Sequence, residues 1–100
     1  MSDTKFISHY DLESIKALIE SGDVFITGTA QNDAEQIGMS VEDILSTVLS
    51  LENKHLYKSM RSTKNPTLWQ DVYHFNDDDI TLYIKLQISN NAIVISFKEK

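Results

Sequence analysis

The sequence predicts an α+β fold in which helices from the N-terminal half pack on an antiparallel sheet formed by the C-terminal half. Two observations lead to this prediction. Apolar residues recur at helical spacing in the first half, whereas from Ile80 to Ile88 they alternate with polar residues, as in a strand with one buried face. With 100 residues, of which 41% are hydrophobic, the chain has room for one core, so we expect a single domain over residues 1–100.

Three helices and one short strand are expected in the first half. The first helix starts after Asp11, which can cap it, and ends before Gly22, where a left-handed residue is favoured. Residues 24–27 are a short strand candidate. A small helix then runs from Thr29 to Gly38, and a third opens at Ser40 with a near capping box.

The last two strands are predicted to form a hairpin whose register follows from alternation. Asparagine tolerates the positive φ of a tight turn, so we place a two-residue turn at Asn90-Asn91. A slip of one residue would put the apolar sets on opposite faces. On the core face this register pairs Ile84 with Phe97, Leu86 with Ile95, and Ile88 with Ile93. On the other face it pairs Tyr83 with Lys98, and Lys85 with Ser96.

Two further strands are expected over residues 56–60 and 69–75. The polar segment from Arg61 to Leu68 joins them, and residues 76–79 form a turn before the hairpin. In residues 69–75, alternation places Gln70 and His74 on one side and Trp69 on the other. The pattern does not decide which side is buried.

Composition excludes several classes of protein. The chain has no cysteine, which excludes disulfides and thiolate metal sites. Its N-terminus lacks the basic start and apolar run of a signal peptide, and no stretch approaches the roughly 18 apolar residues of a membrane span. We therefore expect a cytoplasmic protein.

Charge is distributed unevenly along the chain. The net charge is −6, but residues 1–52 hold ten acids and two bases, or −8, while residues 53–100 hold seven bases and five acids, or +2. Between Asn53 and Gln70 there is no acid. This distribution is compatible with a cationic patch on an acidic body, but composition alone favours the alternative of a solvated loop with ordinary lysines.

The predicted open face of the hairpin carries groups suited to cleaving RNA without a metal. The 2′-hydroxyl of RNA attacks the adjacent phosphate when a base removes its proton, an acid assists the leaving oxygen, and cations stabilise the extra charge. Tyr83 and Lys98 supply a hydroxyl and an ammonium side by side. Nearby cations would favour the tyrosinate, and crowding with Lys58 and Lys85 would lower the pKa of a lysine. The alternative is an ordinary cross-strand pair on a wet sheet face.

Other candidate groups have simpler interpretations. The three histidines, His9, His55 and His74, are dispersed, so neither a two-histidine mechanism nor a zinc site is expected. The acidic run at residues 77–79 lacks the spacing of a calcium loop and is typical of a hairpin tip. Trp69 is a candidate for stacking an RNA base, with a core or rim position as the alternative. No metal or cofactor is expected.

Four blocks of the second half, in order and at matching spacing, resemble the MqsR family of bacterial toxins. The resemblance runs through the whole chain and is strongest from Leu56 to the end. Its strongest blocks are Tyr57-Lys58-Ser59-Met60, Trp69-Gln70-Asp71-Val72-Tyr73, Tyr83-Ile84-Lys85 and Ile95-Ser96-Phe97-Lys98-Glu99-Lys100.

The resemblance implies a RelE-like fold and a sequence-selective mRNA endoribonuclease that is restrained by an antitoxin. That antitoxin would carry a zinc-binding domain and a helix-turn-helix domain, so any contact with DNA would be indirect. The family's active-site residues match Lys58, Gln70, Tyr83 and Lys98. RNA contacts are expected from Arg61, Lys64, Trp69 and Lys85, of which Arg61 and Lys64 lie outside the matching motif.

A second interpretation is a non-catalytic toxin that still binds an antitoxin or a regulator. It depends on the acidic first half, which could form a partner surface. The net charge of −6 is a departure from the family, whose members tend to be basic.

Overall fold

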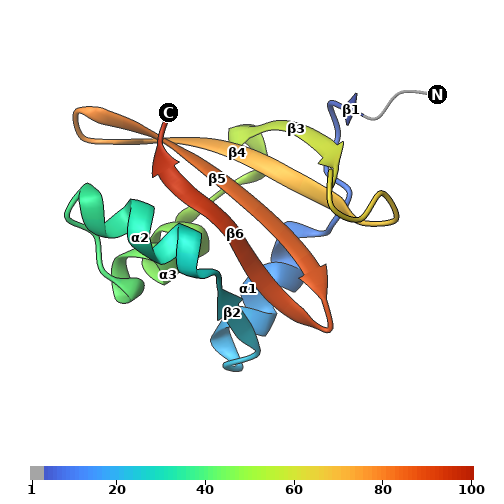
Figure 1. The fold of residues 1–100 in the computed structure, drawn as a ribbon, viewed down its shortest axis with the longest axis horizontal. Coiled ribbons are helices and arrows are strands. Elements are labelled where there is room, and N and C mark those ends of the chain that lie inside the picture. Colours follow the sequence, from blue (N-terminus) through green and yellow to red (C-terminus); the bar gives the residue numbers. More distant parts are fainter. Residues whose placement is uncertain (1–3) are drawn as a thin grey trace.

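The computed structural model describes residues 4–100 and arranges them as a layer of helices on a sheet (Figure 1). Residues 1–3, which contribute to the expectation about a signal peptide, lie outside the described part. The elements are β1 (Thr4–Lys5), α1 (Leu12–Glu20), β2 (Val24–Ile26), α2 (Gly28–Gln36), α3 (Val41–Ser50), the 3₁₀ turn η1 (Asn53–His55), β3 (Leu56–Arg61), β4 (Trp69–Asp77), β5 (Ile80–Ser89) and β6 (Asn91–Glu99).

The described strands form one sheet in the order β1-β3-β4-β5-β6-β2. The predicted antiparallel arrangement is confirmed for β3 to β6. It is wrong at one edge, where β2 runs parallel to β6 and makes the sheet mixed. There Ala92 donates its amide to the Asp23 carbonyl, and Thr27 donates its amide to the Val94 carbonyl. The short strand β2, between α1 and α2, thus adds to the edge of the hairpin parallel to β6.

The helix starts follow the predicted capping chemistry in part. Ser40 and Asp43 form the expected capping box at the start of α3. The helix α2 starts earlier than predicted, because the Thr27 hydroxyl accepts a hydrogen bond from the Ala30 amide. Asp11 occupies the N-cap position of α1, but its carboxylate accepts from the Ser14 hydroxyl rather than from a helix amide.

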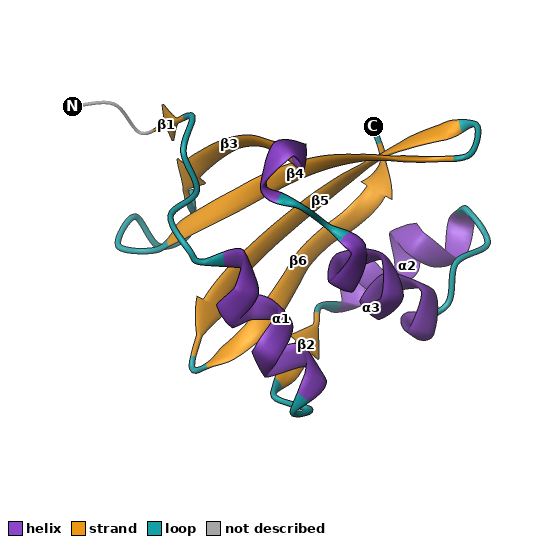
Figure 2. Ribbon diagram, turned by 180° about the vertical axis from the view of Figure 1, so that it is seen from behind, coloured by secondary structure: helices purple, strands orange, loops and turns teal. Residues whose placement is uncertain are grey.

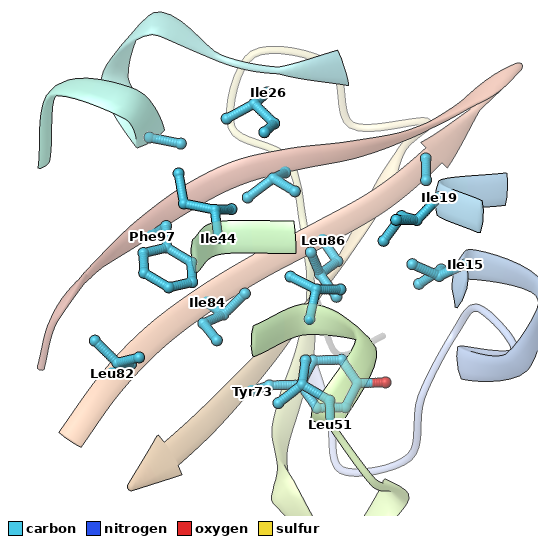
Figure 3. Close-up of a cluster of buried hydrophobic side chains, with 14 of the residues drawn as sticks. Ile15, Ile19, Ile26, Ile44, Leu51, Tyr73, Leu82, Ile84, Leu86 and Phe97 are labelled. Carbon is cyan, nitrogen blue, oxygen red and sulfur yellow. The ribbon is translucent and has the colours of Figure 1, made fainter. Parts of the chain in front are cut away.

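All three helices cover the same face of the sheet (Figure 2). Isoleucines and leucines of α1 and α3 meet the inner side chains of the central strands in one core (Figure 3). From the sheet, Tyr73, Ile84 and Phe97 contribute side chains that are fully buried. The opposite face carries no helix and is called the open face below. None of the helices within residues 4–100 is long and apolar enough to cross a membrane.

The β5–β6 register agrees with the prediction at one end of the hairpin and departs from it at the other. Pairing of Ile84 with Phe97, Tyr83 with Lys98, and Lys85 with Ser96 is confirmed. Beyond Lys85 the register shifts by one residue, so Leu86 pairs with Val94 and Ile88 with Ala92. The predicted pairs of Leu86 with Ile95 and Ile88 with Ile93 are therefore wrong. A β-bulge makes Ile95 the extra residue, so Ala92 and Val94 fill the core in place of Ile93 and Ile95.

Strand β4 is buried on both sides, which explains why alternation did not orient it. Tyr73 faces the helices, and Val72 faces the other way, yet both are fully buried. The strand also runs further than predicted, to Asp77, and leaves a turn at Asp78, which has a φ of 53°. Asp71 lies on the helix-covered side with Tyr73.

The carboxylate of Asp71 attaches the N-terminal segment to β4. It is fully buried and accepts the His9 amide at 2.9 Å and the Tyr10 amide at 2.9 Å. The Tyr10 hydroxyl donates to the Trp69 carbonyl at 2.7 Å, which strengthens the same attachment. The chain therefore enters α1 from a fixed point on the sheet.

Replacing Asp71 with alanine should lower the free energy of unfolding by about 2–4 kcal/mol, because buried amides left without an acceptor cost about 1–3 kcal/mol each. Urea unfolding followed by circular dichroism measures the change. The exposed carboxylate of Asp79 provides the matched control, Asp79→Ala, with an expected effect within about 0.5 kcal/mol. Equal stabilities of the two variants would contradict this role of Asp71.

Candidate active site

The four residues matched by the family resemblance lie on four adjacent strands of the open face. Lys58 is on β3, Gln70 on β4, Tyr83 on β5 and Lys98 on β6. Each alternates with a buried neighbour that faces the helices, such as Ser59 or Phe97, so each side chain is directed away from the core. Strand pairing arranges these residues in rows across the sheet.

Cross-strand pairing places Tyr83 beside Lys98, and the next set of paired residues places Lys85 near Lys58 and Lys98. Tyr83 pairs with Lys98 across the hairpin, and the Lys98 ammonium is 5.3 Å from the Tyr83 ring centroid. In the next row Val72 lies between Lys58 and Lys85, with Lys85 5.8 Å from the Tyr83 ring. Three lysines and a tyrosine thus share a small area of the open face.

The environment changes the proton affinity of two of these groups in opposite directions. Burial and then the charges of Lys98 and Lys58 lower the pKa of Lys85, as predicted for crowded lysines. For Tyr83 the shift of the pKa is opposite to the one that nearby cations would favour. Burial, followed by Tyr57, raises the pKa of Tyr83, because removing the phenol from water disfavours its charged form. The Tyr83 hydroxyl is therefore a proton donor at neutral pH.

His74 also belongs to this group, although the dispersed positions of the histidines in the sequence gave it no expected role. It pairs with Tyr83 across β4 and β5, and the two ring centroids are 6.1 Å apart. Its imidazole stacks on Tyr57 at 4.3 Å. Burial, followed by the charges of Lys100 and Lys58, lowers the pKa of His74 below 6.5. The alternation of Gln70, Val72 and His74 was the signal that could have placed it here.

Tyr57 reaches the open face because β3 is irregular at this point. Leu56 pairs with Tyr73 and Lys58 pairs with Val72, so the register shifts across Tyr57. Strict alternation would direct Tyr57 and Lys58 to opposite faces. The bulge lets Tyr57 stack on His74 while Lys58 pairs with Val72. The Lys58 ammonium lies 5.3 Å from the Tyr57 ring.

The predicted RNA-contacting residues divide into two groups. Lys85 lies on the open face, and Lys64 is in the exposed β3–β4 loop that lines a groove beside Gln70. Trp69 and Arg61 lie apart from the open-face group, next to the N-terminal segment. The Trp69 ring stacks on His9 at 5.4 Å, and Lys5 and Arg61 approach it at 4.4 Å and 4.8 Å.

The other two histidines are separate from the open-face group. His9 is at Trp69, where burial and then Lys5 lower the pKa of its imidazole. His55 makes an edge contact with Phe75 at 5.0 Å and accepts the Glu52 amide through Nδ1. Within residues 4–100, no three His, Cys, Asp or Glu side chains are grouped so that they could hold a metal ion.

Comparison with known proteins shows the family of the chain. Residues 7–99 match the model of a family described as motility quorum-sensing regulator, toxin of MqsA. The chain belongs to the MqsR toxin family. It is 30% identical over 92 residues to the mRNA interferase toxin MqsR of Escherichia coli (strain K12), an alignment that covers 92% of this chain and 94% of that protein. The family resemblance of the sequence blocks is confirmed.

The lowered pKa values of His9 and His74 make the stability of this MqsR family member depend on pH. In the unfolded chain both imidazoles return to a pKa near 6.5, so as the pH falls through 6.5 the unfolded state binds more protons than the folded state. The free energy of unfolding should therefore be highest above pH 7 and fall as the pH decreases through 6.5. Urea unfolding at several pH values measures this. The double variant His9→Gln/His74→Gln should flatten the dependence in this range, and an unchanged slope would contradict the prediction.

Proposed function

We propose that this chain is the toxin of a toxin–antitoxin system and that it cleaves mRNA as a metal-independent, sequence-selective endoribonuclease. The observation that carries the proposal is the gathering of Lys58, Gln70, Tyr83 and Lys98 on one face of a member of the MqsR family. The E. coli relative is named an mRNA interferase, which supports the same reaction here. Cleavage of mRNA would inhibit translation and growth.

In the proposed reaction the 2′-oxygen of one nucleotide attacks its 3′-phosphorus, and the bond from phosphorus to the 5′-oxygen of the next nucleotide breaks. The products are a 2′,3′-cyclic phosphate and a 5′-hydroxyl. Lys58 and Lys98 would stabilise the charge on the phosphate in the transition state. Tyr83, protonated at neutral pH, would hydrogen-bond the phosphate or protonate the leaving oxygen, and Gln70 would orient the RNA.

His74 is the group on this face best suited to accept the proton of the 2′-hydroxyl. Its pKa lies below 6.5, so its imidazole is neutral at pH 7 and has a free lone pair. It is adjacent to Tyr83, so one base and one acid can act on the two sides of the same phosphate. Stacking on Tyr57 restricts the orientation of its ring.

The proposal includes the fold family, the partner and the compartment. The order of helices and antiparallel strands supports a RelE-like single domain over residues 1–100. The name of the family supports a cognate MqsA-like antitoxin, for which we propose a zinc-binding domain and a helix-turn-helix domain that alone contacts DNA. An mRNA substrate supports a cytoplasmic location.

Purified protein should cut single-stranded RNA in the presence of EDTA and leave the cyclic and 5′-hydroxyl ends described above. Tyr83→Phe and Lys98→Ala should each lower the rate by about 100-fold or more, because each removes a group that acts in the transition state. Single-turnover cleavage with end-group mapping measures both effects. Lys16→Ala, on α1, is the control and should keep full activity. Wild-type rates in Tyr83→Phe and Lys98→Ala would contradict the assigned site.

Replacing His74 with glutamine should lower the cleavage rate by about 100-fold or more, as expected for loss of a general base. In the wild type the rate should rise with pH and level off above the lowered pKa of His74, because only the neutral imidazole accepts a proton. The variant should lose this rise. His55→Gln serves as the control, and a His74→Gln profile parallel to the wild type would exclude His74 as the base.

A further inference from the structure

A groove of about 370 Å³ lies beside the candidate active site, between the β3–β4 loop and the open face. Gln70, Lys85 and Gln87 line it from the sheet, Lys64 and Leu68 from the loop, and Ile95 from β6. Gln70 and Lys85 also belong to the group described above. The groove is therefore continuous with the place where the scissile phosphate would lie.

The floor of the groove is a pair of buried amides. Gln70 is 8% exposed and Gln87 is 6% exposed, and they are joined by one hydrogen bond of 3.2 Å from Gln70 Nε2 to Gln87 Oε1. Within the described residues, Gln70 Oε1 and Gln87 Nε2 have no hydrogen-bond partner. If both amides are turned over, the hydrogen bond runs the other way and again leaves one acceptor and one donor. The pair thus offers an adjacent donor and acceptor to a ligand in either orientation.

This combination fits the edge of a nucleobase. Bases present a donor next to an acceptor on their Watson–Crick edges. The free ends of the two amides reach solvent, so a base that cannot pair with them would displace water without replacing its hydrogen bonds. Leu68 and Ile95 provide apolar contact for the faces of a flat ring. Lys64 and Lys85 provide positive charge for the flanking phosphates.

The two elements that shape the groove are irregular. Ile95 is the bulge residue of β6, and its carbonyl accepts the Thr27 hydroxyl at 2.9 Å, which fixes the bulge against the start of α2. The loop is closed by the Ser62 amide donating to the Leu68 carbonyl at 2.8 Å. Arg61 donates to the Pro66 carbonyl at 2.9 Å and braces the same loop. Both walls are therefore held in position before any ligand arrives.

We propose that the groove is a nucleobase subsite and that Gln87, together with Gln70, recognises the hydrogen-bonding edge of a base next to the scissile phosphate. Gln87 is thus a specificity-determining residue. The inference rests on the proposed endoribonuclease function. It assigns sequence selection to the groove, whereas the chemistry belongs to the row of Tyr83 and Lys98.

The test compares the cleavage motifs of the wild type and of Gln87→Leu, which keeps the size of the side chain but removes its donor and acceptor. A randomised single-stranded RNA pool is cut, and the new 5′ ends are sequenced. The values of kcat/KM are then measured on the preferred oligonucleotide and on its single-base substitutions. Gln87→Leu should reduce discrimination at one position by about 10-fold or more while the other positions keep their preferences. Gln36→Leu, an exposed glutamine of α2, is the matched control and should leave the motif unchanged.

Two results would overturn the subsite. One is an unchanged motif with a rate that falls equally on all oligonucleotides, which would mean that Gln87 only supports the fold. The other is an unchanged motif in Gln87→Glu, which retains the length of the side chain and replaces its donor by an acceptor. The second variant decides the matter if Gln87→Leu does not fold.

A binding arm separates this inference from the proposed function. Oligonucleotides with 2′-O-methyl groups cannot be cleaved, so their affinities report base recognition alone. Base-dependent affinity that is lost in Gln87→Leu supports the subsite even if the wild type cuts no RNA, in which case only the endoribonuclease proposal fails. Affinity that is equal for all bases in the wild type overturns the subsite even if cleavage occurs.

Discussion

The packing of the central strands on the helices decides which side chains are available for chemistry. Tyr73, Ile84 and Phe97 are fully buried against α1 to α3, and the side chains of a strand alternate between its faces. Once these apolar residues occupy the core, Tyr83 and Lys98 must lie on the open face. A slip of one residue in β6 would bury Lys98 and expose Phe97, and a slip in β5 would bury Lys85 and expose Ile84; either would cost several kcal/mol. The stability of the core therefore also holds the candidate active site in register.

Two β-bulges modify this alternation, and both lie at the margins of the open-face group. The shift across Tyr57 brings an extra aromatic ring to His74, and the shift after Lys85 places Ile95 in the wall of the groove. A regular sheet would offer one residue in every two to the open face. A bulge adds a residue where the regular pattern would leave none, at the cost of local ladder hydrogen bonds. The regular pairing of β5 with β6 thus positions Tyr83 and Lys98, while the two bulges bring Tyr57 and Ile95 to the edges of the site.

The limits of prediction from sequence follow from the same physics. The pairing of Tyr83 with Lys98 was predictable because isoleucine and leucine alternate strictly through β5. The register beyond Lys85 was not, because residues 92–95 are all apolar and either alternate set could fill the core. The strand β1 has two residues, too few for a periodic signal. The strand β2 was expected within residues 24–27, but its parallel pairing with β6 depends on a distant partner that the local pattern does not show.

The candidate site shows the same division between local pattern and distant contact. Lys58 and Gln70 were placed with Tyr83 only by the family resemblance, since nothing in their own strands shows which face is open. His74 shared the alternation of Gln70 but had no apparent role until its contacts with Tyr57 and Tyr83 were known. Gln87 lies in the strand with the clearest pattern, but its pairing with Gln70 joins residues 17 positions apart.

The acidic net charge is compatible with an RNA substrate because the acids and the candidate site occupy different layers. The carboxylates of residues 11–52 lie on or between helices, and most of them are exposed to solvent. Packed layers are separated by roughly 10 Å, whereas charges are screened over about 8 Å at physiological ionic strength. The potential above the open face is therefore set mainly by Lys58, Lys85 and Lys98. Repulsion by the helical layer then disfavours RNA on the wrong side of the sheet, so the charge asymmetry directs the substrate to the face that carries the lysines, Tyr83 and His74.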